Sequence, residues 1–294
     1  MTALKTATND LLTQLKNAAT NSADIYVSII PFAKDVNVGS GNYAASWIDW
    51  SDWDKNNGTC SKGLSTKYSD CMLENGNPKW TPNSHSTWNG CVTDRGSSTA
   101  PTGPDYDTNA NPPSSSQSSK FSAEQYGSCT QAMLPLTNTW SQMTTLVGNM
   151  SPAGNTNQGI GLAHGWMSLV GGGPYPTPPA KDPNYTYSDV IILLTDGLNT
   201  ENRWFKNQAS IDARQQLTCD NINAANITLY TIQVNTGGDP VSTLLKKCAG
   251  TAPGPGVSRK YPDPDKNFVV TSSNGIGTVF KEIGTNLAKL RIAK

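Results

Sequence analysis

The sequence predicts an α/β fold: a doubly wound, mostly parallel sheet flanked by helices, lacking its first strand and carrying a long disulfide-stapled insertion. One observation is the apolar run at 190–194, which cannot alternate between core and solvent and so predicts a strand buried on both faces. Another is the alternation of strand and helix patterns along the chain, which is typical of right-handed crossover units. A third is that the first element is a helix, so we expect the sheet to begin one strand late.

The first two elements are a helix and a strand. Residues 2–19 place Leu4, Leu11 and Leu15 on one side at helical spacing, which predicts an amphipathic helix. The apolar segment 24–32 follows and predicts a strand. A helix with no strand before it resembles the second half of a βαβ unit.

The regular patterns then stop between residues 34 and 128. This stretch is rich in Gly, Asn, Pro and Ser, and it holds five of the eight tryptophans. A structureless loop of that length is improbable inside a compact domain. We therefore predict an insertion at 34–128 in an α/β domain formed by residues 1–33 and 129–294.

Periodic structure returns after the insertion and continues to the end of the chain. Strands and helices alternate again, which supports the crossover units inferred above. The predicted elements are a strand at 132–136, helices at 137–147 and 158–169, the strand that ends at Thr195, a helix at 207–225, a strand at 227–234, a helix at 241–248, a strand at 268–270 and a helix at 275–290.

Six cysteines and two histidines restrict the chemistry. The cysteines are even in number and none has CxxC spacing, which argues against a zinc ribbon and favours three disulfides in an oxidising compartment. Two of the predicted pairs rest on proximity in the sequence, because the first four cysteines could pair in three ways. The third pair joins two predicted helices, one before and one after the strand at 227–234. The predicted pairs are Cys60–Cys71, Cys91–Cys129 and Cys219–Cys248.

The overall charge and the absence of an export signal set further expectations. With 22 basic and 22 acidic side chains, the chain lacks the basic excess of a nucleic-acid-binding protein. Because no leader or membrane-spanning segment accompanies the cysteines, we expect the natural start of the protein to lie upstream of Met1. No Ser-His-Asp or paired-acid constellation stands at the predicted strand ends, so a non-enzymatic role is expected.

Two polar loops are expected to lie at the same edge of the predicted sheet. Gly154-Asn155-Thr156-Asn157 precedes a helix, and Asp196 follows the central strand, at the edge where α/β sheets bind ligands. Together they resemble the second and third parts of the metal-ion-dependent adhesion site of von Willebrand factor A (vWA) domains. The resemblance implies that Thr156 and Asp196 contribute oxygen ligands to Mg²⁺ or another divalent cation, through which the family binds proteins. The alternative is that Asp196 caps a helix or accepts hydrogen bonds from the 154–157 loop.

Other segments narrow the resemblance. Residues 229–235, 244–249 and 287–294, with Trp88–Cys91 and Asp94-Arg95, are similar to vWA-containing proteins of the tight-adherence (Tad/Flp) pilus assembly family. This similarity implies a protein-binding role in pilus assembly or surface adhesion, with partners in the pilus or cell envelope. It also implies a periplasmic or cell-surface location and an inner-membrane anchor in the full-length protein.

The chain departs from that family at its beginning. The first motif, Asp-x-Ser-x-Ser, would directly precede the helix at residue 2 and is absent. We therefore expect an incomplete cation site with weak or absent affinity for Mg²⁺, and membrane contact only through the missing amino-terminal anchor.

The insertion suggests one alternative function. Trp47, Trp50 and Trp53 could form a sugar-stacking face, which would make the chain a carbohydrate-binding surface module, or they could fill a small core. The segment 105–109 begins like a calcium loop but lacks the required Gly and distal Glu, so we expect a solvated acidic loop there.

Overall fold

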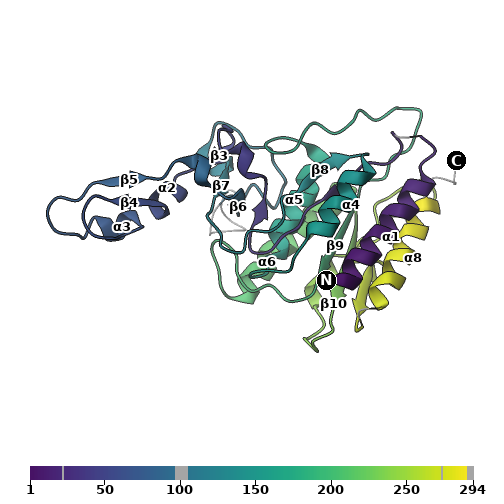
Figure 1. The fold of residues 1–294 in the computed structure, drawn as a ribbon. Helices are drawn as coiled ribbons and strands as arrows, with labels where there is room; N and C mark the ends of the chain where they lie inside the picture. The colour runs from purple at the N-terminus through teal and green to yellow at the C-terminus, as the bar shows by residue number, and fades with distance from the viewer. Residues whose placement is uncertain (22, 97–104, 273, 290–294) are drawn as a thin grey trace.

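The computed structural model describes residues 1–21, 23–96, 105–272 and 274–289, which form a mixed α/β structure (Figure 1). Three parallel strands, β9 (Val190–Thr195), β10 (Thr228–Val234) and β11 (Asn267–Val270), form one sheet in the order β11-β10-β9. Strands β1 (Val27–Ile29) and β8 (Leu134–Thr137) form a separate antiparallel pair. The predicted α/β class is confirmed, but the strands make two small sheets in place of one continuous doubly wound sheet.

Helices cover both faces of the three-stranded sheet. On one face α1 (Thr2–Ala18) and α8 (Gly275–Lys289) lie side by side over Tyr230 and Ile232, while α4 (Trp140–Asn149) packs against α1 (Figure 1). On the other face α5 (Gln158–Val170), α6 (Gln208–Ala224) and α7 (Thr243–Cys248) share a core with Leu229. Successive residues of β10 thus enter opposite cores, as the pleat of a strand requires.

The expectation that β9 is buried on both faces is only partly correct. Ile191 and Leu193 are buried beneath α5, whereas Val190, Ile192 and Leu194 are only half-buried. Within the described residues no strand pairs with the second edge of β9 or of β1. Without a neighbouring strand on that side, part of the apolar surface of β9 stays accessible.

Polar side chains define where the helices on the α5 face begin. Asn157 accepts a hydrogen bond from the backbone amide of Ile160 at the start of α5, and Asn207 does the same for Ser210 at the start of α6. Ser242 caps α7 in the same way through Leu245. Each cap satisfies an amide that has no partner within its helix. For this reason the observed starts of these helices are close to the starts predicted from the sequence.

The segment between β1 and β8 forms a small sheet and a projecting arm. The sheet has the order β2-β6-β7-β3, and Figure 1 shows the arm, with β4 and β5 as a hairpin, extending away from the α/β part. The elements of this segment are β2 (Val36–Asn37), β3 (Ile48–Asp49), α2 (Trp53–Asn56), β4 (Gly58–Cys60), α3 (Tyr68–Cys71), β5 (Trp80–Pro82), β6 (Cys91–Thr93) and β7 (Phe121–Ala123). The described 3₁₀ helices are η1 (Ser40–Asn42), η2 (His85–Thr87), η3 (Gln117–Ser119) and η4 (Pro264–Lys266).

All three predicted disulfides are present. Their Cα–Cα distances are 5.4 Å for Cys60–Cys71, 5.8 Å for Cys91–Cys129 and 5.0 Å for Cys219–Cys248, within the normal range. Three such bonds indicate an oxidising, extracellular or periplasmic environment. Across the described part of the chain, every helix is too short or too polar to traverse a bilayer.

The tryptophans of the insertion pack mainly on one another. Trp53 and Trp88 are each 2% exposed. Trp50 meets both of them edge-on, with ring centroids 5.4 and 5.3 Å away, and stacks on His85 at 3.9 Å. Trp47 packs edge-on against Phe121. The aromatic groups therefore form a small core, the second of the two expectations for these residues.

Candidate functional site

The two predicted motif loops meet at the carboxyl end of β9. The amide of Thr156 donates to the Thr200 hydroxyl at 2.8 Å, and the amide of Thr200 donates to the Thr156 carbonyl at 2.9 Å. Gln158 adds two bonds, from its amide to Asn199 Oδ1 at 2.8 Å and from Nε2 to the Gly197 carbonyl at 3.0 Å. We call this surface the rim and define it as residues 33–35, 154–158 and 196–203, together with Asp94, Glu124 and Tyr126.

Thr156 and Asp196 take different positions within the rim. Thr156 is half-buried and its backbone is held by Thr200, as described above. Asp196 is exposed, and its carboxylate forms no hydrogen bond or ion pair with the described residues. It therefore neither caps a helix nor binds the 154–157 loop; Thr200 contacts that loop through Thr156, and Asn199 accepts from the amide of Gln158 at the start of α5.

The residues present do not fit a divalent ion. Thr156 and Asp196 offer two oxygen ligands from side chains, whereas Mg²⁺ requires near-octahedral oxygen coordination and is usually held by carboxylates and phosphates. Among the described residues, no group of three or more His, Cys, Asp or Glu side chains is arranged to hold a metal ion. No chemical step is therefore assigned to a metal at the rim.

A lysine stands among the carboxylates of the rim. The side chain of Lys34 is 8% exposed; its ammonium pairs with Glu124 and lies 3.7 Å from Asp35 Oδ1. It also lies 4.8 Å from the centre of the Tyr126 ring, and the Tyr126 hydroxyl accepts a hydrogen bond from the Asn155 amide. Burial lowers the pKa of Lys34, but the charges of Asp35 and Glu124 outweigh it, so the pKa is raised and the ammonium stays protonated.

Two carboxylates behind the 154–157 loop are buried. Asp35 is 0% exposed, and its Oδ1 lies 3.7 Å from the Lys34 ammonium. Burial, with the charge of Glu124, raises the pKa of Asp35 well above its ordinary value. Asp94 accepts hydrogen bonds from Asn157 Nδ2 at 2.9 Å and from the Arg203 amide at 3.1 Å. Burial also raises the pKa of Asp94, against the opposing charge of Arg214.

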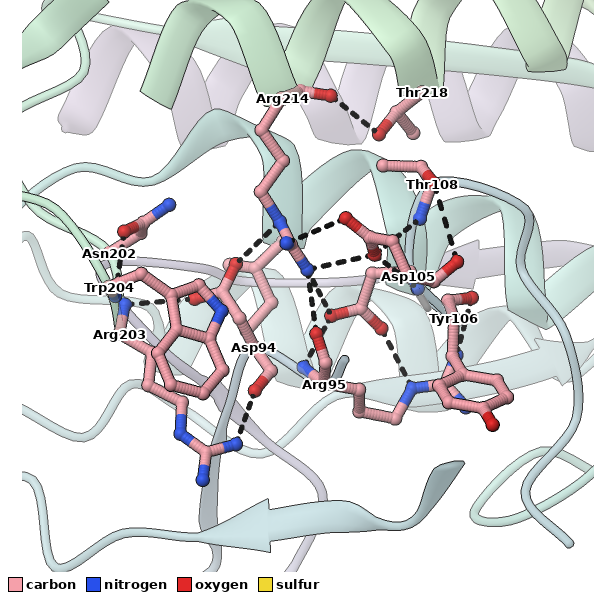
Figure 2. Close-up of polar contacts among 12 residues, drawn as sticks. Asp94, Arg95, Asp105, Tyr106, Thr108, Asn202, Arg203, Trp204, Arg214 and Thr218 are labelled. Atoms are coloured by element: carbon pink, nitrogen blue, oxygen red, sulfur yellow. Dashed lines mark hydrogen bonds and ion pairs between the residues drawn. The ribbon is translucent and has the colours of Figure 1, made fainter. Parts of the chain in front are cut away.

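A buried ion-pair network joins the insertion to α6. Figure 2 shows Arg214 reaching from α6 between Asp94 and Asp105. Arg214 Nη1 lies 2.6 Å from Asp105 Oδ2, and its Nη2 donates to the Arg95 carbonyl at 2.7 Å. Arg95 is 1% exposed and donates from its amide and from Nε to Asp107, both at 2.7 Å. The expected solvated acidic loop at 105–109 is therefore wrong, because both carboxylates are buried against arginines.

The same contacts set the protonation of these carboxylates. Burial tends to raise the pKa of Asp107, but Arg95 and Arg214 outweigh it, so the pKa is lowered. Burial raises the pKa of Asp105 to about 6, against the opposing charge of Arg214. The network between the insertion and α6 therefore contains a carboxyl group with a pKa of about 6.

The two histidines lie outside the rim. His164, within α5, bonds through Nδ1 to the Tyr175 hydroxyl at 2.7 Å, and burial lowers its pKa to about 3. His85 lies in the insertion and bonds to Asp54 at 2.7 Å. The polar groups of the rim itself are amides, hydroxyls, carboxylates, the Lys34 ammonium and the Arg203 guanidinium, which suit recognition of a polar surface.

Sequence reasoning did not find Lys34, Asp35, Glu124 or Glu201 as rim residues. Asn155 Nδ2 donates to Glu201 at 2.6 Å, so this glutamate also borders the loop. The only signal was the position of Lys34 and Asp35 just after the predicted strand at 24–32, where side chains reach the edge of a sheet.

Comparisons with protein-family models, curated proteins and solved structures found no match to this chain.

Proposed function

We propose that this chain is a non-enzymatic, vWA-type protein-binding domain that acts in Tad/Flp pilus assembly or in surface adhesion. The observation that supports it best is the pair of reciprocal hydrogen bonds between Thr156 and Thr200. These bonds join the two loops that carry the adhesion-site motifs, as the resemblance requires. In the part of the chain that the structure describes, β1 and β9 each have one edge without a paired strand, which also agrees with an α/β sheet from which one strand is missing.

The rim has the properties of a preorganised binding surface. Gly154, Asn155, Asp196 and Thr200 are exposed, while the neighbouring Asn157 and Asn199 are buried and hydrogen-bonded. Loops fixed from below lose little conformational entropy when they bind. The unpaired carboxylate of Asp196 suits a basic side chain on a protein partner.

The proposed setting is the cell envelope, with partners in the pilus or on the cell surface and an inner-membrane anchor in the full-length protein. Three disulfides support an exported location. The aromatic groups of the insertion give no comparable support to carbohydrate binding, because Trp53 and Trp88 are buried and one face of Trp50 stacks on His85.

The test compares the rim with the opposite end of the same strand. Partners are first cross-linked to the purified protein in envelope extracts of the source organism, and the affinity of each purified candidate is then measured directly. Asp196→Ala is expected to weaken the true partner about tenfold, or about 1.4 kcal/mol. The matched control is Asp189→Ala, because Asp189 precedes β9 at its other end. Equal affinities for wild type and Asp196→Ala, or loss only in Trp50→Ala, would contradict the proposal.

A further inference from the structure

We infer that the end of the projecting arm docks onto the surface of a bilayer that contains anionic lipid. We call this end the tip and define it as residues 61–79, which lie between β4 and β5 and include α3. Figure 1 shows the arm extending away from the α/β part, so the tip can reach a surface that the rest of the molecule does not touch. This contact goes beyond the proposed function, which concerns the rim, and it is separate from the expected amino-terminal anchor.

The tip exposes four large apolar side chains. Leu64 is 99% exposed and Leu73 is 84% exposed, the two highest values among the large apolar residues that the structure describes. Tyr68 and Met72, which lie one turn apart at α3, are also exposed. Neighbouring apolar groups that are left in water mark a site of contact with a protein or a membrane.

The two leucines belong to loops that touch each other. Ser65 Oγ donates to Glu74 Oε1 at 2.9 Å, and Gly63 lies so close to the Glu74 carboxylate that an added Cβ would clash with it. Leu64 stands between Gly63 and Ser65 in the chain, and Leu73 directly precedes Glu74. The exposed leucines are therefore part of one surface region.

Lysines accompany these leucines. Lys62 and Lys67 lie on the loop that carries Leu64, and the Lys79 amide donates to the Ser61 hydroxyl at 2.8 Å, at the start of that loop. Across the described part of the chain, none of the three lysines forms an ion pair. Three lysines against two acidic side chains make the tip slightly basic in a chain of zero net charge. Unpaired ammonium groups beside exposed apolar groups complement anionic headgroups above an acyl layer.

A bilayer fits this surface better than a pocket on a protein partner. The side chains that dominate protein interfaces are held in well-packed, preorganised positions. Leu64 is instead almost fully exposed, and within the tip only the disulfide-bonded Cys71 is buried, so no core fixes the leucine side chains. A bilayer requires no fixed shape, because lipids rearrange around an inserted side chain. Tyr68 also has the amphipathic ring that favours the membrane interface.

The experiment measures co-sedimentation of the purified chain, with its disulfides intact, with vesicles of phosphatidylcholine alone or with about a third phosphatidylglycerol. The wild type is expected to bind the anionic vesicles at least tenfold more tightly, since each lysine near such a surface contributes about fivefold. Leu64→Ser/Leu73→Ser should weaken this binding at least tenfold, because it removes the groups that enter the acyl boundary. Lys62→Gln/Lys67→Gln should also weaken it at least tenfold and reduce its dependence on salt.

The matched controls change similar side chains outside the arm. Val241→Ser/Val257→Ser removes two exposed apolar side chains of the α/β part, and Lys246→Gln/Lys247→Gln removes two exposed lysines of α7. Both should bind vesicles like the wild type. Asp196→Ala should do the same, which separates this measurement from the test of the rim. The changed tip residues are all exposed, so their variants should keep the melting temperature of the wild type.

Three results would overturn the inference. The first is a wild type that binds neither kind of vesicle. The second is equal affinity of the wild type and Leu64→Ser/Leu73→Ser for the anionic vesicles. The third is a dimer of the wild type in sedimentation velocity that the same leucine variant does not form, which would assign the tip to a contact between two copies of the chain.

Discussion

Replacing Arg95 by Met should destabilise the protein strongly, because its guanidinium is the main compensating charge for buried Asp107. Arg95 donates twice to Asp107, and its remaining donors bond to the carbonyls of Tyr106, Asn111 and Ser119. One of the two bonds to Asp107 comes from the backbone amide and survives the substitution. The variant thus keeps a buried carboxylate with one amide donor and with Arg214 at 3.7 Å.

The expected cost is about 3–5 kcal/mol, the range for removing one partner of a buried ion pair. That is a large part of the total stability of a typical domain, which is about 5–15 kcal/mol. The matched control is Lys181→Met, whose ion pair with Asp189 is exposed on both sides, and its cost should be below about 1 kcal/mol.

Unfolding in guanidinium chloride, followed by tryptophan fluorescence without reductant, measures both variants. The double variant Arg95→Met/Asp107→Leu should recover part of the loss, because it removes the uncompensated carboxylate together with its partner. A cost for Arg95→Met no larger than that of the control, or a double variant less stable than the single one, would refute the assignment of a buried ion pair.

Two further predictions concern pH and packing. The Asp105 side chain is 5% exposed and its pKa is raised to about 6, so its protonation stabilises the fold at low pH, and this contribution is lost as pH rises from about 4 to 6. The resulting loss in the free energy of unfolding is at most about 3 kcal/mol. Asp105→Asn should remove this decrease with pH in unfolding titrations, and a variant whose free energy of unfolding falls with pH as steeply as that of the wild type would contradict the prediction. Gly161→Ala should destabilise by about 1–3 kcal/mol, because the added Cβ would lie 2.6 Å from the Phe32 ring. In Gly148→Ala the added Cβ meets nothing within 4 Å, so this variant should be as stable as the wild type or more stable when the melting temperatures of both variants are measured. Equal losses of stability in the two variants would contradict the close packing of Gly161 on Phe32.

Local signals in the sequence were sufficient for most helices and strands of the α/β part. The helix predicted at 158–169 is α5, and the one at 207–225 is α6, because Asn caps and apolar spacing act over a few residues. The disulfides were also predictable, since their partners are separated by 11, 38 and 29 residues.

Long-range pairing was not predictable from such signals. The strand predicted at 24–32 is ordered as a strand only at Val27–Ile29, and it pairs with β8 more than a hundred residues later. The burial of Asp105 depends on Arg214, which lies on α6 far along the chain, so the local acidic pattern favoured a solvated loop. The surroundings of Lys34 could not be predicted beyond its position after the strand at 24–32, because the carboxylates near it come from three separate segments.

The central claim is that the rim around Thr156 and Asp196 binds a protein partner. The most direct measurement is the affinity of the purified partner for wild type and Asp196→Ala, each in Mg²⁺ and in EDTA. We predict equal wild-type affinity in both buffers and about tenfold weaker binding of the variant. Loss of wild-type binding in EDTA, or an unchanged affinity in Asp196→Ala, would contradict the account.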